Sequence, residues 1–184
     1  MKNKIKKNLL IIMFTMFTST SFGEYDKIAY EFSFEGIDGN PIKLKQFENK
    51  VIVVINVASK CGFTKQYEDM QDVWVKYQKK GIVMLGAPSN DFNQESGTRK
   101  EIKTFCESKF GITFPMTDKI SVKGDNAHPF YKWAKENYGK KAIPKWNFHK
   151  ILINRDGKIE DTFAPFTNPQ SKKIISKIEK VLKQ

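Results

Sequence analysis

The feature that most constrains the fold is an unbroken run of apolar, mostly β-branched residues at positions 51–57 (Val-Ile-Val-Val-Ile-Asn-Val). Such a run is typical of a strand that is covered on both faces. A helical pattern follows, with one face formed by Tyr67, Met70, Trp74 and Tyr77, and a second apolar run occupies positions 82–87. This order of strand, helix and strand predicts a parallel pair joined by a right-handed crossover.

Two hairpins are predicted on either side of this unit. Alternating apolar residues at 28–34, a turn at 38–41 and renewed alternation at Ile42 and Leu44 indicate an N-terminal β-hairpin. Near the other end, residues 148–154 and 158–163 flank an Asp-Gly turn and indicate a second hairpin.

Three further helices are indicated by their starts. Thr98 and Glu101 form a capping box, Pro129 suits the first turn of a helix, and Pro169 leads a final amphipathic segment. Together these elements predict one α/β domain, in which helices flank a mixed central sheet and a β-hairpin lies at the N-terminus.

Residues 1–23 have the layout of a secretory signal peptide. An apolar segment at 9–17 follows four lysines, and Ser21 and Gly23 have the spacing for cleavage after Gly23. The apolar segment is shorter than the roughly 20 residues of a membrane span, so we expect no stable membrane insertion after cleavage. The predicted mature domain is 24–184, exported to the periplasm or secreted.

The formal net charge of the chain is +12, and removal of residues 1–23 takes away four lysines and no acidic residue. The remaining lysines are scattered along predicted helices, as on solvated helix faces, so we expect no nucleic-acid partner. His128 and His149 are too far apart for a metal site, and no third ligand is evident, so no metal or cofactor is predicted. His128 is expected to cap or pack at a helix start, and His149 to face outward from its strand.

Cys61 is the main candidate for chemistry. It lies between a buried strand and a helix, where open α/β sheets place their sites. Helix N-terminal amides and Lys60 would favour the thiolate and lower the pKa of Cys61. A buried structural thiol is the alternative. Thr64 stands where a thiol–disulfide oxidoreductase has its second cysteine, which disfavours direct dithiol exchange.

Three ordered motifs resemble those of the glutathione peroxidase family, in its cysteine-containing, non-selenium bacterial form. They lie at 56–64 (Asn-Val-Ala-Ser-Lys-Cys-Gly-Phe-Thr), 88–97 (Pro-Ser-Asn-Asp-Phe-Asn-Gln-Glu-Ser-Gly) and 146–153 (Trp-Asn-Phe-His-Lys-Ile-Leu-Ile). The resemblance covers essentially the whole mature chain. It implies a thioredoxin-like fold and an antioxidant peroxidase that converts hydrogen peroxide or organic hydroperoxides to water or alcohols.

The resemblance also implies a reactive tetrad of Cys61, Gln94, Trp146 and Asn147. The Cys61 thiolate would attack the peroxide and become a sulfenic acid. The Gln94 amide and the Trp146 indole would donate hydrogen bonds, and Asn147 would add a donor or hold the loop. Because the spacing from Phe92 to Gln94 is one residue shorter than in the usual motif, Gln94 would need a rearranged loop to reach Cys61.

The expected reductant is glutathione or a thioredoxin-like protein. Cys106 is the possible resolving cysteine, but it shares an apolar helical face with Ile102, so a packed thiol and a stable disulfide with Cys61 also remain open. The segment 128–146 has no room for the extra segment used in tetramer assembly by animal members, so a monomer is expected. The alternative functions are a thiol–disulfide exchange protein and a non-catalytic binding module on the same fold.

Overall fold

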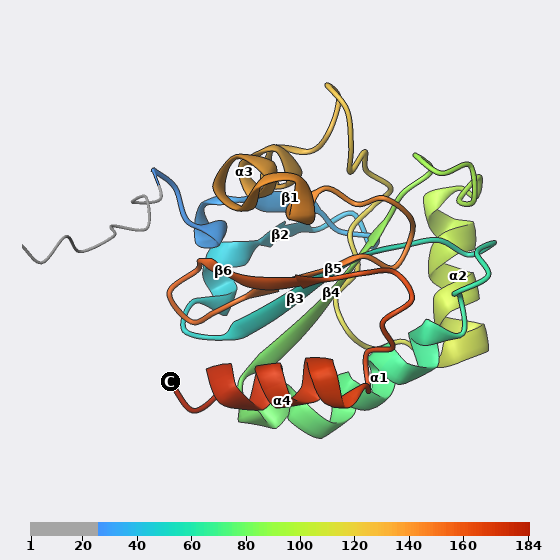
Figure 1. Cartoon of the computed structure of the whole chain (residues 1–184). Helices are drawn as coiled ribbons and strands as arrows, with labels where there is room; N and C mark the ends of the chain where they lie inside the picture. The colour runs from blue at the N-terminus through green and yellow to red at the C-terminus, as the bar shows by residue number, and fades with distance from the viewer. Residues whose placement is uncertain (1–25) are drawn as a thin grey trace, which may run out of the picture.

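A mixed four-stranded sheet lies at the centre of the computed structural model, which describes residues 26–184 (Figure 1). β3 (Val51–Val57) runs parallel to β4 (Ile82–Pro88) and antiparallel to β5 (Lys150–Ile153). β6 (Ile159–Phe163) pairs antiparallel with β5, so the strand order is β4-β3-β5-β6. The predicted parallel pair and the second hairpin are therefore confirmed. The predicted signal segment lies outside the described residues.

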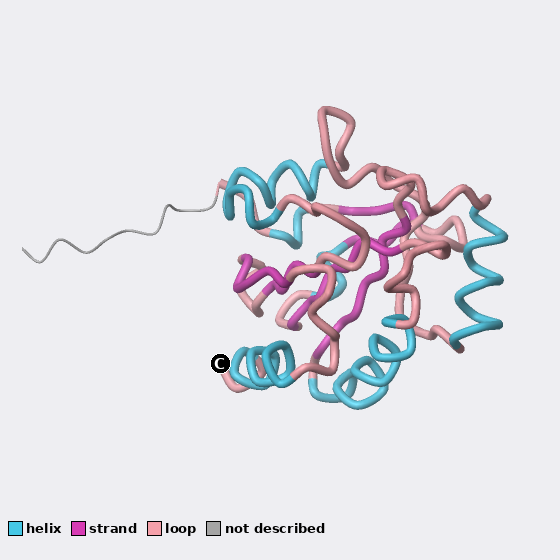
Figure 2. Tube along the Cα trace, turned by 45° about the vertical axis from the view of Figure 1, so that its right-hand side comes forward, coloured by secondary structure: helices cyan, strands magenta, loops and turns pink. Residues whose placement is uncertain are grey.

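Helices cover both faces of this sheet, as Figures 1 and 2 show from two directions. α1 (Gln66–Tyr77) and α4 (Lys172–Val181) lie against one face, and α3 (Pro129–Tyr138) lies against the other. α2 (Arg99–Phe110) stands beside the first half of α1, where Tyr67 packs on Phe110. Among the described residues, no helix has the length and apolarity needed to cross a membrane.

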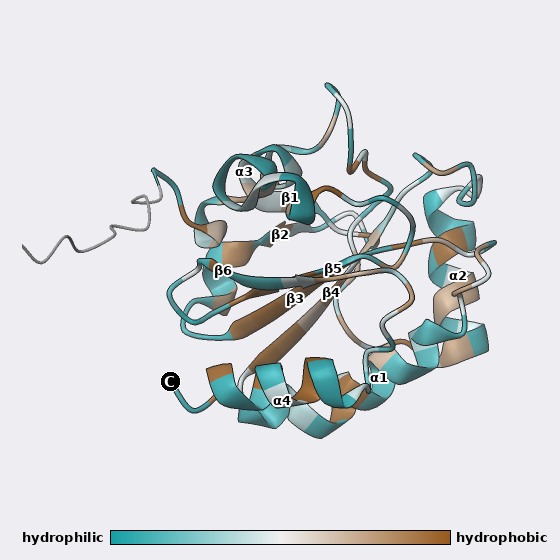
Figure 3. Ribbon diagram, in the orientation of Figure 1, coloured by the Kyte–Doolittle hydropathy of each residue, from teal (hydrophilic) through white to brown (hydrophobic). Residues whose placement is uncertain are grey.

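The strand β3 is central to the core because its alternate side chains pack into two different apolar clusters. Val51, Val53 and Ile55 pack with the inner faces of α1 and α4, whereas Ile52 and Val54 pack with α3 and the N-terminal hairpin. The apolar colour of β3 and β4 in Figure 3 marks this double burial. The unbroken apolar run is explained by it, since each face of the strand needs its own apolar side chains.

Side-chain caps set the starts of the later helices. The Thr98–Glu101 capping box begins α2, as predicted. His128 accepts a hydrogen bond from Phe130 N through Nδ1 at 3.3 Å, which confirms its capping role at α3. The prediction for α4 was wrong in detail, because Pro169 lies before the helix and Ser171 is its N-cap residue.

The N-terminal hairpin consists of β1 (Ser33–Glu35) and β2 (Pro41–Lys43). The expected alternation from residue 28 is wrong in its first part, where Ala29–Glu31 forms a 3-10 helix. This turn is stabilised because the Glu31 carboxylate accepts a hydrogen bond from Ile28 N at 2.9 Å. Residues 26–184 contain three more short 3-10 helices, at Leu44–Phe47, Gln78–Lys80 and Gly139–Ala142.

The outer edge of β4 is covered at Gly86 by the segment 115–117. Gly86 N donates to Pro115 O at 3.0 Å, and Thr117 N donates to Gly86 O at 2.8 Å. A Cβ atom at Gly86 would lie 3.2 Å from the Phe114 ring and 3.3 Å from Met116 Cγ. Glycine therefore leaves room for the close approach of this segment.

Candidate active site

Cys61 lies directly beyond the carboxyl end of β3 and is 8% exposed. Its sulfur accepts one hydrogen bond among the described residues, from Phe63 N at 3.4 Å. The Lys60 ammonium group donates to Ser96 Oγ at 2.9 Å, and no hydrogen bond joins it to the thiol of Cys61. The backbone amide of Phe63 is thus a donor that the sulfur of Cys61 already uses.

Thr64 fixes the turn that carries Cys61. Its Oγ1 accepts from Cys61 N at 3.0 Å and lies 2.6 Å from Cys61 O and 3.0 Å from Ala58 O. A hydroxyl with these contacts closes the turn between β3 and α1. Position 64 therefore shapes the loop instead of supplying a second thiol.

Gln94 and Asn147 are brought together, as the resemblance implied. Asn147 Nδ2 donates to Gln94 Oε1 at 2.9 Å, and Lys60 N donates to Gln94 O at 3.1 Å. Asn147 is fully buried, so the Gln94 amide is held from one side by a fixed donor. Its NH2 group makes no hydrogen bond to another described residue and remains a free donor.

The loop before Gln94 turns sharply at Asn93, which has a left-handed backbone conformation. Asn93 has a φ of 57°, and its N–H donates to Asn90 O at 2.9 Å. Asparagine tolerates this conformation better than most residues. The resulting tight turn carries Gln94 up to the backbone of Lys60, beside Cys61.

Trp146 lies at the surface, with 42% of the residue exposed, and its ring packs on Phe92 at a centroid distance of 5.4 Å. No hydrogen bond joins its indole to another described residue. The structure therefore places Trp146 at the same end of the sheet as Cys61.

Asn56, which sequence reasoning did not single out, holds the Trp146–Asn147 loop against β3. Its side chain donates to Trp146 O at 3.1 Å and accepts from His149 N at 3.1 Å. Its carbonyl accepts from Phe148 N at 2.6 Å. Phe148 has a φ of 68°, a strained value for a bulky residue that is kept by the burial of its ring.

Glu95 is a second residue that sequence reasoning missed. It is 1% exposed, and its Oε2 accepts from Ser59 N at 2.7 Å and Ser59 Oγ at 2.8 Å. The carboxylate thus ties the loop of the second motif to the residues that precede Cys61. Its position next to Gln94 was the available signal, but glutamate in a loop usually faces solvent.

Cys106 lies in the middle of α2 and is fully buried. Burial raises the pKa of its thiol to about 11, and the charge of Glu95 adds to the rise, while Tyr67 opposes it. Both cysteines are free thiols, so the stable disulfide considered above is not formed in this structure. The described residues contain no group of three or more potential metal-binding side chains.

The outward orientation expected for His149 is wrong, because the side chain is only 6% exposed. Burial, together with the neighbouring Lys150, lowers the pKa of His149 to about 4. Lys150 is itself fully buried, and its ammonium group donates to Gln66 Oε1 (2.6 Å), Thr167 O (2.7 Å) and Pro165 O (3.1 Å). These bonds join the start of α1 to the loop before α4.

The sheet, the covering helices and a cysteine after β3 define a thioredoxin-like protein. The crystal structure of Trgpx in its apo form superposes with a TM-score of 0.69 and 38% identity, covering 86% of this chain and 97% of that chain. The predicted fold class is therefore confirmed.

Sequence comparison identifies the family within this fold. The sequence model of the family described as glutathione peroxidase matches residues 29–135. "Hydroperoxy fatty acid reductase gpx1" of Synechocystis sp. is 41% identical over 162 residues, covering 83% of this chain and 95% of the relative. "Glutathione peroxidase homolog BsaA" of Bacillus subtilis is 42% identical over 160 residues, with coverages of 84% and 98%. The chain belongs to the glutathione peroxidase family, and it is a thiol-dependent peroxidase.

Proposed function

We propose that the protein reduces hydrogen peroxide and organic hydroperoxides at Cys61 through a sulfenic acid. The observation that carries this proposal is the Asn147–Gln94 hydrogen bond, which fixes the Gln94 amide and leaves its NH2 group free. A free donor beside the Cys61 loop is suited to bind a peroxide oxygen during attack by the thiolate. The exposed Trp146 indole supplies a second donor at the same end of the sheet.

The reaction has two stages. The Cys61 thiolate attacks the terminal peroxide oxygen, the O–O bond breaks, and the leaving alkoxide or hydroxide takes a proton to become an alcohol or water. Cys61 is oxidised to the sulfenic acid. A thiol then forms a mixed disulfide with Cys61 and releases water, and a second thiol restores the Cys61 thiol and leaves as a disulfide.

We propose that glutathione or a thioredoxin-like protein supplies these thiols. A resolving role for Cys106 requires α2 to open, because this thiol is fully buried and its pKa is raised to about 11. Direct thiol–disulfide exchange is disfavoured as the main activity, since Thr64 closes the Cys61 turn.

The test is peroxide turnover by the reduced protein, with glutathione and glutathione reductase in one series and thioredoxin and thioredoxin reductase in the other. Cys61→Ser should lower turnover by at least about a thousandfold with either reductant. Loss of thioredoxin-dependent turnover in Cys106→Ser would assign Cys106 as the resolving cysteine, and unchanged turnover would make it a packing residue. Cys61→Ser with wild-type activity, or no dimedone adduct on Cys61 after peroxide, would contradict the proposal.

We further propose that residues 1–23 are a cleaved secretory signal, that the mature domain 24–184 is periplasmic or secreted, and that it is a monomer. The proposal is supported by the lysines and the apolar segment at 9–17. N-terminal sequencing of the protein from fractionated cells should find Glu24 first in the exported fraction. Protein that retains Met1 in the cytosol would contradict export, and sedimentation analysis of the mature chain would test the monomer.

A further inference from the structure

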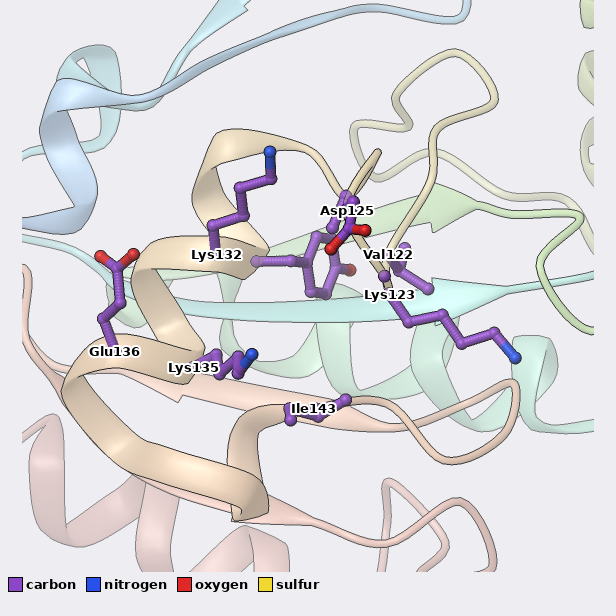
Figure 4. Close-up of a pocket in the computed structure, with 10 residues that line it drawn as sticks. Val122, Lys123, Asp125, Lys132, Lys135, Glu136 and Ile143 are labelled. Carbon is purple, nitrogen blue, oxygen red and sulfur yellow. The ribbon is translucent and has the colours of Figure 1, made fainter.

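A cavity of about 430 Å3 lies between α3 and the loop that precedes it, outside the tetrad. Its apolar lining includes Val122, Ala127 and Ile143. Figure 4 shows that Lys132, Lys135 and Glu136 come from α3, Val122, Lys123 and Asp125 from the facing loop, and Ile143 from the segment below. No step of the proposed peroxidase reaction uses this cavity.

Tyr131, which also lines the cavity, carries an unpartnered buried hydroxyl. The residue is 4% exposed, and its hydroxyl has no hydrogen-bond partner among the described residues. Burial and the charge of Asp91 both raise the pKa of Tyr131, so the hydroxyl keeps its proton and can donate. Buried polar groups in folded proteins nearly always have a partner, so this hydroxyl is a candidate donor to a molecule in the cavity.

The charges around the cavity favour an anion. Lys123, Lys132 and Lys135 line it, against Asp125 and Glu136, and the nearby Asp91 carboxylate already accepts hydrogen bonds from Val122 N and Lys123 N. Lys132 and Lys135 are exposed and make no ion pair with any residue in the described range. The two side chains lie three residues apart on one helix and extend in different directions in Figure 4, but both are long enough to turn toward one ligand group.

Two side-chain contacts connect the cavity to the tetrad. Lys123 Nζ lies 4.2 Å from the centroid of the Phe92 ring, which packs on Trp146. Val122 N also donates to Asp91 Oδ2 at 2.6 Å, next to Phe92 in the loop that carries Gln94. A molecule that fills the cavity would therefore lie against residues that support the reactive site.

We propose that this cavity binds the carboxylate end of a molecule with an apolar chain. The carboxylate accepts a hydrogen bond from Tyr131 and is neutralised by Lys132 and Lys135, while the chain lies along Val122 and Ile143 toward Phe92. Two sources share this chemistry: a carboxylic acid that is no peroxide, and the far end of a hydroperoxide whose other end reaches Cys61. Only the second source rests on the proposed function.

Binding is tested with decanoate, by isothermal titration calorimetry of the reduced full-length chain. Lys132→Glu/Lys135→Glu should weaken binding at least tenfold, and Tyr131→Phe severalfold. The matched control is Lys180→Glu/Lys183→Glu, with the same charge change and spacing at exposed positions elsewhere, and should stay within twofold. Thermal melts establish that each variant is folded. No saturable binding at millimolar decanoate, which would mean a cavity holding water only, or equal losses in the control would overturn the proposal.

The source is then decided by kinetics with linoleic acid hydroperoxide and cumene hydroperoxide. If the cavity holds the substrate's carboxylate, Lys132→Glu/Lys135→Glu raises KM about tenfold for linoleic acid hydroperoxide only, and decanoate competes with it. An unchanged KM together with lost decanoate binding supports a separate ligand at the same site. Decanoate binding without any Cys61-dependent turnover would overturn the proposed function and leave this binding site standing.

Discussion

The two cysteines show how differently one fold can treat the same side chain. Cys61 follows a strand, accepts a backbone hydrogen bond and is 8% exposed. Cys106 sits inside a helix, is fully buried, and has its pKa raised to about 11. We expect reactivity to depend on the element that carries the thiol, because a loop after a strand offers amides and access, whereas a helix interior offers neither.

The largest expected difference is in alkylation rate. With iodoacetamide at pH 8, Cys61 of the reduced protein should react on the order of a hundredfold faster than Cys106, because Cys106 needs local opening of α2. Peptide mass spectrometry over a time course measures both rates. In urea the two thiols should react at similar rates, and equal rates in the native protein would break the contrast.

Asn56→Ala should disturb the loop beside Cys61 while leaving the surroundings of Cys106 unchanged. It removes two buried side-chain hydrogen bonds to the Trp146–Asn147 loop, so the free energy of unfolding should fall by about 2–4 kcal/mol, together with peroxide turnover. Urea unfolding and turnover at saturating reductant provide the measurements.

The matched control for Asn56→Ala is Asn154→Ala at the far end of β5. The Asn154 side chain likewise makes two hydrogen bonds, in which Oδ1 accepts from Asp156 N and Lys158 N. This variant should lose stability while keeping its turnover per folded molecule. Equal losses of turnover in both variants would refute a positioning role for Asn56.

Cys106 should also make the protein less stable in alkali. Because its folded pKa is about 11 and its ordinary value is 9.0, the unfolded chain loses this proton first as pH rises. Stability should therefore fall between about pH 9 and pH 11, by on the order of 2 kcal/mol. Cys106→Ala should flatten this slope relative to wild type, whatever its stability at pH 7, and an unchanged slope would disprove the raised pKa.

Glu95→Gln should give the smallest of these effects, and it should act on Cys106 and not on Cys61. The amide oxygen still accepts from Ser59, so the loop before Cys61 should keep its place. Loss of the negative charge should lower the pKa of Cys106 and speed its alkylation a fewfold. Glu107→Gln, whose exposed carboxylate has a smaller effect on the same thiol, is the control.

Much of the fold was predictable from sequence because its signals are local. The apolar run of β3 and the Thr98–Glu101 box depend on neighbouring residues, and both predictions were confirmed. Pro169 misled because proline also suits the residues before a helix, where Ser171 supplies the cap. The first residues of the hairpin misled because period-two spacing does not exclude a 3-10 turn held by Glu31.

The site was predictable only in part. The resemblance brought Gln94 and Asn147 together, and their hydrogen bond is present. The supporting residues Asn56 and Glu95 were missed because their partners lie 36 to 93 residues away in sequence. The inward orientation of His149 likewise depends on the loop packed over β5, which no local pattern encodes.

The covered edge of β4 has a consequence for behaviour at high concentration. Exposed strand edges recruit strands from other molecules and lead to aggregation. At Gly86 both backbone groups already bond to the segment 115–117, so a second chain would first have to displace that segment. A Cβ atom at Gly86 would press on the Phe114 and Met116 side chains of this covering segment, so glycine lets the segment lie close to the edge. The single glycine of β4 thereby lets the chain cover its own strand edge.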